Sequence, residues 1–340
     1  MRQIWITKHG GPEVLEVREA PDPTPGPGEV RIRVKASGVN FADTSARIGV
    51  YPDAPPPPCV VGYEVSGLID AVGEGVDAGR VGQRVLAAVR FGGYSDVVCA
   101  RDAFAIEMPA SMSFDEGAAL PVQYFTAHHM LSYLGNVKRG DTVLIHAAAG
   151  GVGLAALQLC KHAGAVTFGT ASASKHDFLR EAGLDHAIDY RTRDFEAEVR
   201  RLTNGRGVDI ALDAQGGASL KKSFRSLAPT GRVFAFGAAS LTPDGTRNVF
   251  SLLKGVLQMP LFELFPLRLM GENRGIFGVN MGHLWDESAI LLRQLGDLLV
   301  LYEQGAIKPV IDARVPFDRA ADAHRRLMDR VNVGKVLLIP

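Results

Sequence analysis

A glycine-rich turn between an apolar run and an apolar-periodic helix is the feature of this chain with the clearest chemistry. Residues 143–159, VLIHAAAGGVGLAALQL, contain the pattern Ala148-x-Gly150-x-x-Gly153. This pattern is the strand-turn-helix fingerprint of a dinucleotide site, with alanine in place of the first glycine. Gly150 leaves room for a pyrophosphate, Gly153 lets the helix approach its strand, and the helix N-terminus offers N–H groups and a positive dipole end. The phosphate contacts that we expect are Gly150, Gly151, Val152 and Gly153.

The sequence around the turn favours this interpretation over an ordinary glycine-rich turn. Residues 143–147 have the composition of a buried strand, and the helical pattern follows without a break. A second strand pattern at 165–169 comes at the distance expected of a nucleotide-binding βαβ unit. We therefore predict a dinucleotide site at this turn.

The end of the second strand indicates which dinucleotide is bound. NAD sites usually place Asp or Glu about 20 residues past the glycines, where the carboxylate holds the ribose 2′-hydroxyl. Here residues 169–176, GTASASKH, contain no acid before Asp177. Ser172 and Ser174 offer hydroxyls, and Lys175 offers a positive charge suited to a 2′-phosphate. The sequence favours NADP(H), and the alternative is a helix-capping serine followed by a solvated lysine.

Length and composition indicate a two-domain protein of the cytoplasm. A chain of 340 residues exceeds what one hydrophobic core usually fills. Basic and acidic residues number 37 each, so no net field attracts nucleic acid or an anionic membrane. The first 17 residues turn polar early and lack the apolar core of a signal peptide. Three cysteines are too few for a disulfide framework.

The first part of the chain has the pattern of a β-rich, barrel-like unit. Residues 1 to about 120 are rich in Gly and Pro, with strand patterns at 30–36 and 60–72. Proline-rich stretches at 21–28 and 55–58 predict loops, because proline cannot donate to a strand ladder.

The rest of the chain alternates strands and helices, as in a doubly wound parallel sheet. Strand patterns at 208–217 and 231–240 follow the nucleotide turn. A helix at 289–304 and a last strand at 335–339 are expected to return to the β-rich unit. We predict an α/β Rossmann domain over residues 125–274, and a β-rich substrate domain formed by residues 1–124 and 275–340.

Seven segments distributed over the whole chain resemble one known family, the zinc-independent medium-chain dehydrogenases/reductases of the quinone oxidoreductase type. They are SGVNFADTSARIGVYP (37–52), GYEVSGLIDAVGEGV (62–76), HAAAGGVG (146–153), FGTASASKH (168–176), IDYR (188–191), YEQGAIKP (302–309) and NVGKVLL (332–338). The NFAD, GTASASKH and NVGKVLL stretches are most similar to the vesicle amine transport protein branch. The resemblance implies a GroES-like fold for the β-rich domain, and a homodimer.

The resemblance raises the question of a metal, because zinc-dependent relatives polarise a carbonyl with a Lewis acid. Where those relatives place ligating Cys and His, this chain has Asn40 and Tyr63. The three cysteines are scattered, and the four-cysteine structural lobe is missing. His128 and His129 are adjacent, so on a helix they diverge and cannot chelate one ion. We predict no metal.

Without a metal, hydride transfer depends on placement and on hydrogen bonds to the developing oxyanion. Quinones and conjugated enones suit such a site, since the incoming charge spreads onto an oxygen. The resemblance places Asn40, Asp43 and Tyr51 at the nicotinamide and substrate cleft. The Asn40 amide could donate to the substrate carbonyl or bind the nicotinamide ribose, Asp43 could fix that arrangement, and Tyr51 could donate a proton. Alternatively, Asn40 caps a turn, Asp43 caps the next helix, and Tyr51 packs beside Pro52.

The resemblance implies further cofactor contacts from both halves of the chain. Thr126 is expected beside the nicotinamide, and Tyr190 near the 2′-phosphate, although Tyr190 could also be a plain core aromatic residue. Backbone groups of Phe277 and Val279 are expected at the carboxamide. The remaining expected contacts are Gly237, Ala238, Asn332 and Lys335.

An apolar segment at 249–270 departs from the compact quinone reductase pattern and keeps two functions open. Pro260, Pro266 and three charged residues interrupt it, which argues against a membrane span. A lid or a subunit interface is favoured over a shallow lipid contact. The first function is an NADPH-dependent reductase of quinones or α,β-unsaturated carbonyls. The alternative is an NADPH-binding adaptor that uses the apolar segment for a membrane or protein partner.

Overall fold

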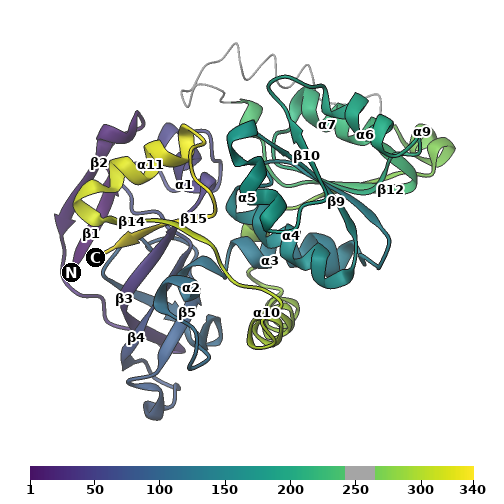
Figure 1. Cartoon of the computed structure of the whole chain (residues 1–340). Helices are drawn as coiled ribbons and strands as arrows, with labels where there is room; N and C mark the ends of the chain where they lie inside the picture. Colours follow the sequence, from purple (N-terminus) through teal and green to yellow (C-terminus); the bar gives the residue numbers. More distant parts are fainter. Residues whose placement is uncertain (242–264) are drawn as a thin grey trace. The chain divides into compact units, whose positions relative to one another are not determined.

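The structure, a computed structural model, describes residues 1–241 and 265–340 and divides into two compact units (Figure 1). Within the described chain, unit 1 comprises residues 1–125 and 289–340, and unit 2 comprises residues 126–241 and 265–288. The first boundary lies one residue from the expected one. The second lies at 288 rather than 274, because β13 (Gly275–Gly278) pairs with β12 (Leu227–Ala235) in the sheet of unit 2.

Unit 1 is built on a seven-stranded, mostly antiparallel sheet. In sheet order its strands are β14 (Ile311–Pro316), β15 (Lys335–Ile339), β3 (Glu29–Val39), β4 (Glu64–Val72), β5 (Arg84–Ala88) and β7 (Ala105–Glu107), with β6 (Val97–Arg101) also paired to β3. A separate ribbon is formed by β1 (Arg2–Ile6) and β2 (Leu15–Glu19). The expected β-rich unit is therefore present, and the predicted last strand has the observed bounds.

Alternation along β3 shows why this sequence forms a half-buried sheet. Val30, Ile32 and Val34 point into a core shared with β4, β5 and β6. Arg31 and Arg33 lie on the opposite face, where both guanidinium groups bind Asp70. A period of two thus separates apolar core from charged surface.

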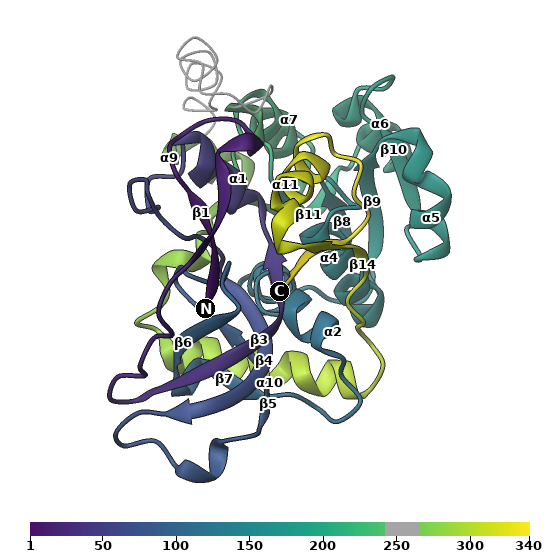
Figure 2. The same cartoon turned by 90° about the vertical axis from the view of Figure 1, so that its left-hand side faces the viewer.

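The helices of unit 1 cover this sheet and its connections. They are α1 (Phe41–Ile48), α2 (Phe114–Ala119), α10 (Ser288–Glu303) and α11 (Ala320–Met328). Helix α2 packs on β3 and β4, and α11 packs on β14 and β15 (Figure 2). Helix α1 begins directly after β3, so the end of that strand and the helix N-terminus share one corner.

Unit 2 is a doubly wound parallel sheet. Its six strands run in the order β10 (His186–Asp189), β9 (Val166–Ala171), β8 (Thr142–Ile145), β11 (Val208–Asp213), β12 and β13, all parallel. This order, third-second-first-fourth-fifth-sixth along the chain of the unit, is that of dinucleotide-binding folds. Helix α3 (Gln123–His128) crosses the boundary from unit 1 into unit 2. The further helices of unit 2 are α4 (Gly151–Ala163), α5 (His176–Glu181), α6 (Phe195–Leu202), α7 (Gly217–Arg225) and α9 (Pro266–Glu272).

Most of the apolar segment at 249–270 lies outside the described residues. Its last residues belong to α9, where Leu269 packs against the core of unit 2. Phe265, Leu267 and Met270 are exposed. In the part of the chain that the structure describes, no helix is long and apolar enough to cross a membrane. The choice among a lid, an interface and a lipid contact stays a prediction.

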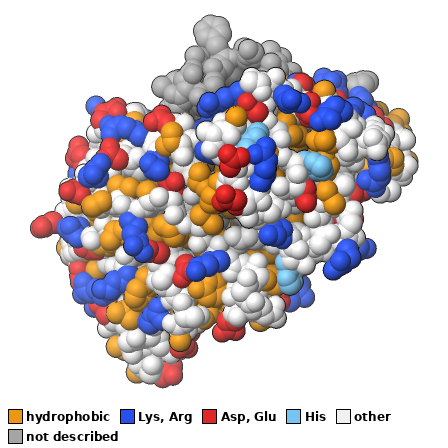
Figure 3. Space-filling model, in the orientation of Figure 1, with side chains coloured by type: hydrophobic (Ala, Val, Ile, Leu, Met, Phe, Trp, Pro, Cys, Tyr) orange, Lys and Arg blue, Asp and Glu red, His pale blue; other side chains and the backbone are white. Residues whose placement is uncertain are grey.

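Charges of both signs are interspersed over the molecular face that Figure 3 shows. This agrees with the equal numbers of basic and acidic residues, 37 each. A face of this kind has no broad field of one sign that would attract a polyanion.

Candidate functional site

Three strand ends of unit 1 bring together three polar side chains that are far apart in the sequence. Asn40 follows β3, Glu64 begins β4, and Lys335 begins β15. The register pairs Val39 of β3 with Val336 of β15, and Ser37 of β3 with Val65 of β4. The positions next to these pairs therefore place Lys335 and Glu64 beside the end of β3, where Asn40 lies.

The three side chains form a buried cluster, named here the Asn40 cluster. Both Glu64 and Lys335 are 0% exposed, and the Lys335 ammonium forms an ion pair with the Glu64 carboxylate. The same ammonium donates to Asn40 Oδ1 at 2.7 Å, and Asn40 Nδ2 donates to Glu64 Oε1 at 2.9 Å. The peptide N–H of Val122 donates to Glu64 Oε2 at 2.7 Å. Each charge of the buried pair thus has further hydrogen bonds, as buried charges require.

A glycine in β3 makes room for the Asn40 cluster. A Cβ atom at Gly38 would lie 2.4 Å from Glu64 Oε1 and 2.6 Å from Lys335 Cε. Any side chain at this position would displace the ion pair, so Gly38 is required by space and not by a turn conformation.

The cluster determines which way the Asn40 amide faces. Lysine can only donate and a carboxylate can only accept, so Oδ1 must face Lys335 and Nδ2 must face Glu64. The second Nδ2 hydrogen points to the Gly38 carbonyl, at a longer 3.4 Å. Both amide donors are therefore engaged inside the protein, whereas donation to a substrate carbonyl was one of two roles expected of Asn40, beside binding of the nicotinamide ribose. The remaining capacity of this side chain is one acceptor lone pair on Oδ1, which suits a ribose or substrate hydroxyl.

Asp43 is a buried anchor and not an exposed catalytic group. It is 0% exposed in α1, and its carboxylate accepts from the peptide N–H of Asn40 at 2.8 Å and from that of Gly62 at 3.0 Å. Burial raises the pKa of Asp43 to about 7, while these N–H groups, Lys335 and a hydrogen bond from Tyr94 oppose the rise. Asp43 therefore ties the start of α1 to the residue that precedes Tyr63.

Tyr51 belongs to a small aromatic group beside this anchor. Its ring lies edge-on to Tyr63, with centroids 6.3 Å apart, and Tyr63 lies 5.3 Å from Phe91. Burial, followed by the negative charge of Asp43, raises the pKa of the Tyr63 phenol well above its ordinary value. The Tyr63 phenol is thus protonated at physiological pH, and Tyr51 lies beside it.

In unit 2 the glycine-rich turn has the geometry of an anion site. Gly150 is the N-cap of α4 and has an extended backbone, with φ −77° and ψ 174°. A Cβ at Gly153 would lie 2.4 Å from the carbonyl oxygen of Ala147, so only glycine lets α4 approach the turn this closely. Ala147 itself has φ 52°, a left-handed conformation that alanine rarely adopts. The turn leaves the N-terminal N–H groups of α4 without a capping side chain.

A buried polar cluster beneath the turn was not foreseen from the sequence. His146 follows β8 and lies 3.0 Å from the Thr170 hydroxyl and 2.9 Å from the Ser223 hydroxyl. Ser223 donates to Asp213 at 2.7 Å, and the N–H of Ala147 donates to Thr170 Oγ1 at 3.3 Å. Burial lowers the pKa of His146, which is therefore neutral at physiological pH. The cluster connects the ends of β8, β9 and β11 and so supports the strained turn.

The residues expected at the 2′-phosphate lie at two neighbouring strand ends. Ala171 of β9 pairs with Asp189 of β10, so Ser172 and Tyr190 follow paired residues. The Ser172 hydroxyl lies 3.2 Å from that of Ser174, and Lys175 closes the same short turn. Tyr190 is 40% exposed, which excludes the plain core role. The structure therefore brings the expected group together at one edge of unit 2.

The other expected cofactor residues occupy several environments. Thr126 is buried in α3. The Val279 N–H already donates to Ala235, while the exposed Phe277 ring stacks on Phe234.

Gly237 and Ala238 follow β12, and a Cβ at Gly237 would lie 2.5 Å from the Ala214 carbonyl. Asn332 donates to the Gly334 carbonyl in its own turn. The Lys335 ammonium is buried and contacts Glu64 and Asn40 Oδ1, and its expected contact with the cofactor stays a prediction.

Residues 1–241 and 265–340 contain no group of three or more His, Cys, Asp or Glu side chains arranged to hold a metal. Asn40 and Tyr63 occupy the positions that the resemblance aligns with the zinc-binding Cys and His of zinc-dependent relatives. The Asn40 amide contacts Glu64, and the Tyr63 ring packs beside Phe91.

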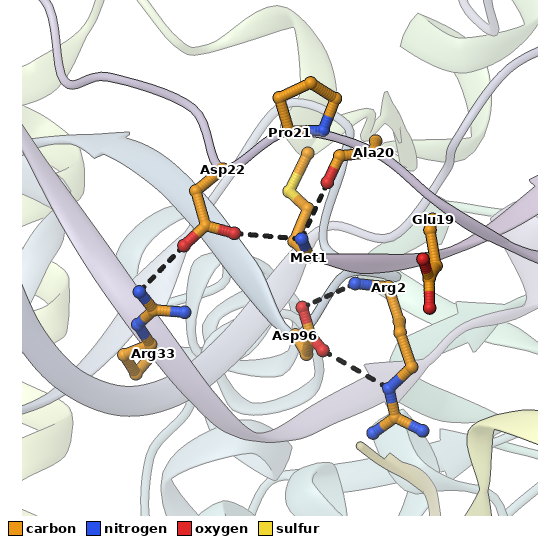
Figure 4. Close-up of a pocket in the computed structure, with 8 residues that line it drawn as sticks. All are labelled: Met1, Arg2, Glu19, Ala20, Pro21, Asp22, Arg33 and Asp96. Atoms are coloured by element: carbon orange, nitrogen blue, oxygen red, sulfur yellow. Dashed lines mark hydrogen bonds and ion pairs between the residues drawn. The ribbon is translucent and has the colours of Figure 1, made fainter.

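A surface hollow of about 600 Å³ in unit 1 is unrelated to these groups. In Figure 4 the Met1 ammonium and the Arg33 guanidinium both contact Asp22, and Arg2 contacts Asp96. The cations that line the hollow are thus neutralised by carboxylates, and none of the expected site residues lines it.

Comparison with known proteins gives matches over both units. The family model described as alcohol dehydrogenase GroES-like domain matches residues 26–111, and that described as zinc-binding dehydrogenase matches residues 182–338. The rat synaptic vesicle membrane protein VAT-1 homolog is 42% identical over 343 residues, which cover 100% of this chain and 84% of that protein.

Two solved structures are similar over the full chain. The human synaptic vesicle membrane protein VAT-1 homolog-like protein is 33% identical with a TM-score of 0.86, covering 100% of this chain and 98% of that one. The Escherichia coli quinone oxidoreductase, solved as a complex with NADPH, is 30% identical with a TM-score of 0.87 and covers 100% of both chains.

Substitution of Gly153 by alanine should weaken dinucleotide binding at least about tenfold, a loss of about 1.4 kcal/mol. The added Cβ would lie 2.4 Å from a carbonyl oxygen and would force the turn to move. Calorimetric titration with NADPH measures the change. Gly296→Ala in α10 is the matched control, because a Cβ there meets no atom within 4 Å. Equal affinity of both variants would contradict the role given to the turn.

Substitution of Lys335 by methionine should lower the free energy of unfolding by about 3–5 kcal/mol, because it leaves the Glu64 carboxylate buried without its counter-ion. Urea unfolding followed by circular dichroism measures this loss. Lys308→Met is the control, since Lys308 is 78% exposed and pairs with Glu116 only at 3.9 Å. Equal losses of unfolding free energy in Lys335→Met and Lys308→Met would contradict the expected cost of leaving Glu64 without its counter-ion.

Proposed function

Because this chain belongs to the medium-chain dehydrogenase/reductase family, we propose that it is an NADPH-dependent reductase that transfers hydride, without a metal, to quinones or α,β-unsaturated carbonyl compounds. The resemblance seen in the sequence is confirmed at the family level, including its closeness to the vesicle protein branch. The similar Escherichia coli protein is a quinone oxidoreductase solved with NADPH. That similarity supports the reaction class but leaves the substrate of this chain as our proposal.

The observation that carries the proposal is the pair of anion-binding features in unit 2. The glycine-rich turn at the N-terminus of α4 fits a pyrophosphate. Ser172, Lys175 and Tyr190 at the ends of β9 and β10 fit a 2′-phosphate, and no carboxylate directly follows β9. The carboxylate of Asp189 accepts hydrogen bonds from Arg191 and Thr192 within its own turn. These residues favour NADPH over NADH.

A bound NADPH supplies the hydride, and the side chains of unit 1 supply orientation. Asn40 has one acceptor position on Oδ1, held in place by Lys335. The Tyr51 phenol can donate a hydrogen bond to the substrate oxygen on which charge develops. Asp43 is too buried to contact a substrate and fixes the backbone of Asn40 instead.

Quinones and enones are the proposed substrates because this arrangement offers no strong electrophile. The Asn40 amide donors are engaged by Glu64 and Gly38, so Tyr51 is the donor that we assign to the substrate. A single neutral hydrogen bond polarises a carbonyl weakly. A conjugated acceptor that spreads the incoming charge is reduced more easily under these conditions than a simple ketone.

A second candidate function, an NADPH-binding adaptor, is favoured by one feature. Phe265, Leu267 and Met270 are exposed on and beside α9, at the end of the apolar segment. Such side chains suit a protein or membrane partner. Tight NADPH binding without turnover of any quinone or enone would favour this adaptor over the reductase.

Chelator-treated protein should oxidise NADPH in the presence of 1,2- or 1,4-quinones or enones, with NADH used at least about tenfold less efficiently. Lys175→Met should lower kcat/KM for NADPH by about 10–100-fold, the value of one charge-assisted hydrogen bond, and leave that for NADH unchanged. Absorbance at the reduced nicotinamide band measures both rates.

The control for this experiment is Lys161→Met, which removes a lysine at the other end of α4 that donates to Ala182 at 3.4 Å. It should leave the preference for NADPH intact. Equal use of both cofactors by the unmodified protein, or equal loss with both in Lys175→Met, would refute the 2′-phosphate assignment.

A further inference from the structure

A row of buried side chains leads from an anchored carboxylate to the glycine-rich turn of unit 2. The Ser223 hydroxyl donates to Asp213 Oδ2 at 2.7 Å and lies 2.9 Å from His146 Nε2. His146 Nδ1 lies 3.0 Å from the Thr170 hydroxyl, and Thr170 Oγ1 accepts from the peptide N–H of Ala147 at 3.3 Å. Asp213, Ser223, His146 and Thr170 are all buried and are named here the His146 row.

The row starts at a carboxylate that several hydrogen bonds hold in place. Asp213 Oδ1 accepts from the peptide N–H groups of Gln215 and Gly216, both at 2.8 Å. Its Oδ2 accepts from the Ser219 hydroxyl at 2.9 Å, in addition to that of Ser223. These donors fix both oxygens, as expected of a buried polar group. The single hydrogen of the Ser223 hydroxyl is thus engaged by this carboxylate.

Donor and acceptor rules then give the row one direction. Because the Ser223 hydrogen points to Asp213, the Ser223 oxygen must accept from His146, whose ring hydrogen is therefore on Nε2. Burial lowers the pKa of His146, so the ring is neutral and its Nδ1 accepts from the Thr170 hydroxyl. The Thr170 oxygen keeps its lone pairs for the Ala147 N–H. The row thus ends in an acceptor that faces the turn.

The residue at the end of the row is strained. Ala147 has φ 52°, in the left-handed region, where the Cβ of an L-residue crowds the following carbonyl. Such a conformation persists only where its surroundings impose it. Thr170 contacts this part of the turn twice, because its hydroxyl accepts from Ala147 and its carbonyl accepts from the Ala148 N–H at 3.0 Å. The row orients the first of these two contacts.

The conformation of Ala147 determines where α4 begins. Its carbonyl accepts from the N–H of Gly150, the N-cap of α4, at 2.8 Å. The same carbonyl oxygen lies 2.4 Å from the position that a Cβ at Gly153 would take. A rotation of the backbone at Ala147 would therefore displace the first turn of α4, whose N–H groups are the proposed pyrophosphate contacts.

We propose that the four residues of the His146 row are positioning residues, which hold Ala147 in its left-handed conformation and so direct the N-terminus of α4 toward the cofactor pyrophosphate. They act through Ala147 and not by contact with the cofactor. This inference rests on the proposed function, because the pyrophosphate is that of the NADPH used by the proposed reductase.

The test is calorimetric titration of the full chain and its variants with two ligands. Thr170→Val keeps the shape of the side chain and removes the acceptor of the Ala147 N–H. It should weaken NADPH binding about tenfold, because the strained turn is no longer held. Binding of adenosine 2′-monophosphate should be unchanged, because this ligand carries the 2′-phosphate and no pyrophosphate. Equal losses for both ligands, or no loss for NADPH, would overturn the proposal.

A matched control lies on the same strand, β9. The Thr167 hydroxyl donates to the Asp185 carboxylate at 2.8 Å and accepts from the Asp185 N–H at 3.1 Å. Thr167→Val therefore also removes buried hydrogen bonds, and it should lower the unfolding temperature but leave NADPH affinity unchanged. Thr170→Ser keeps the hydroxyl and should bind NADPH as the unmodified protein does. The same loss of affinity in Thr167→Val as in Thr170→Val would show a general effect of β9 and contradict the proposal.

Relief of the strain at Ala147 gives a second, independent readout. Glycine adopts the left-handed conformation without the cost of a Cβ, so Ala147→Gly removes the need for the row. The double variant Thr170→Val with Ala147→Gly should bind NADPH within about threefold of the unmodified protein. An affinity as low as that of Thr170→Val alone would mean that the row does not act through Ala147.

Hydrogen exchange without nucleotide tests the row separately from the proposed function. The amides of residues 146–150 should exchange faster in Thr170→Val and Ser223→Ala than in the unmodified protein, and at the normal rate in Thr167→Val. Failure of the unmodified protein to bind NADPH would reject the proposed function, yet these rates would still decide whether the row holds the turn. A normal rate in Thr170→Val would overturn the inference, and a normal rate in Ser223→Ala would exclude Ser223 and Asp213 from the row.

Discussion

The ion pair of Glu64 and Lys335 is the constraint around which unit 1 is organised. Removing two charges from water costs several kcal/mol for each, and their mutual attraction repays this only when further hydrogen bonds complete the site. Here the Asn40 amide and the Val122 N–H complete it. The pair also requires glycine at position 38 and the observed register of β3 with β4 and β15. Fold and site therefore depend on the same contacts.

In both units, a buried polar cluster at the ends of strands holds nearby groups in place. In unit 1 the Asn40 cluster fixes the orientation of an amide, and the Asp43 carboxylate holds the peptide N–H groups of Asn40 and Gly62. In unit 2 the cluster around His146 joins three strand ends beneath a turn that contains a left-handed alanine. Each cluster holds a group that local conformational preference alone would leave mobile. Such preorganisation is what the proposed hydride transfer without a metal needs.

Sequence patterns predicted the features that depend on residues close together in the chain. They missed the side-chain contacts that depend on how the strands pair. The glycine-rich turn, the alternation in β3 and the bounds of β15 follow from local pattern, and the structure contains all three. Lys335 was expected at the cofactor, because nothing in its own segment shows that Glu64, 271 residues away, takes its charge. Likewise the Asn40 amide was expected to donate to a substrate carbonyl or to bind the nicotinamide ribose, and only the cluster shows that both of its donors are engaged within the protein. Polar residues at the ends of apolar strands, such as His146 and Asp213, were the available signal for the second cluster.

The central claim is that the buried ion pair orients Asn40, while its net contribution to the stability of the fold is small because the desolvation of two charges offsets their attraction. The most direct measurement is steady-state reduction of a quinone by NADPH with the double variant Glu64→Gln and Lys335→Met, which neutralises both charges together. We expect unfolding free energy within about 2 kcal/mol of the unmodified protein, an unchanged KM for NADPH, and a kcat at least about tenfold lower. A double variant that folds and keeps its full kcat would contradict the claim.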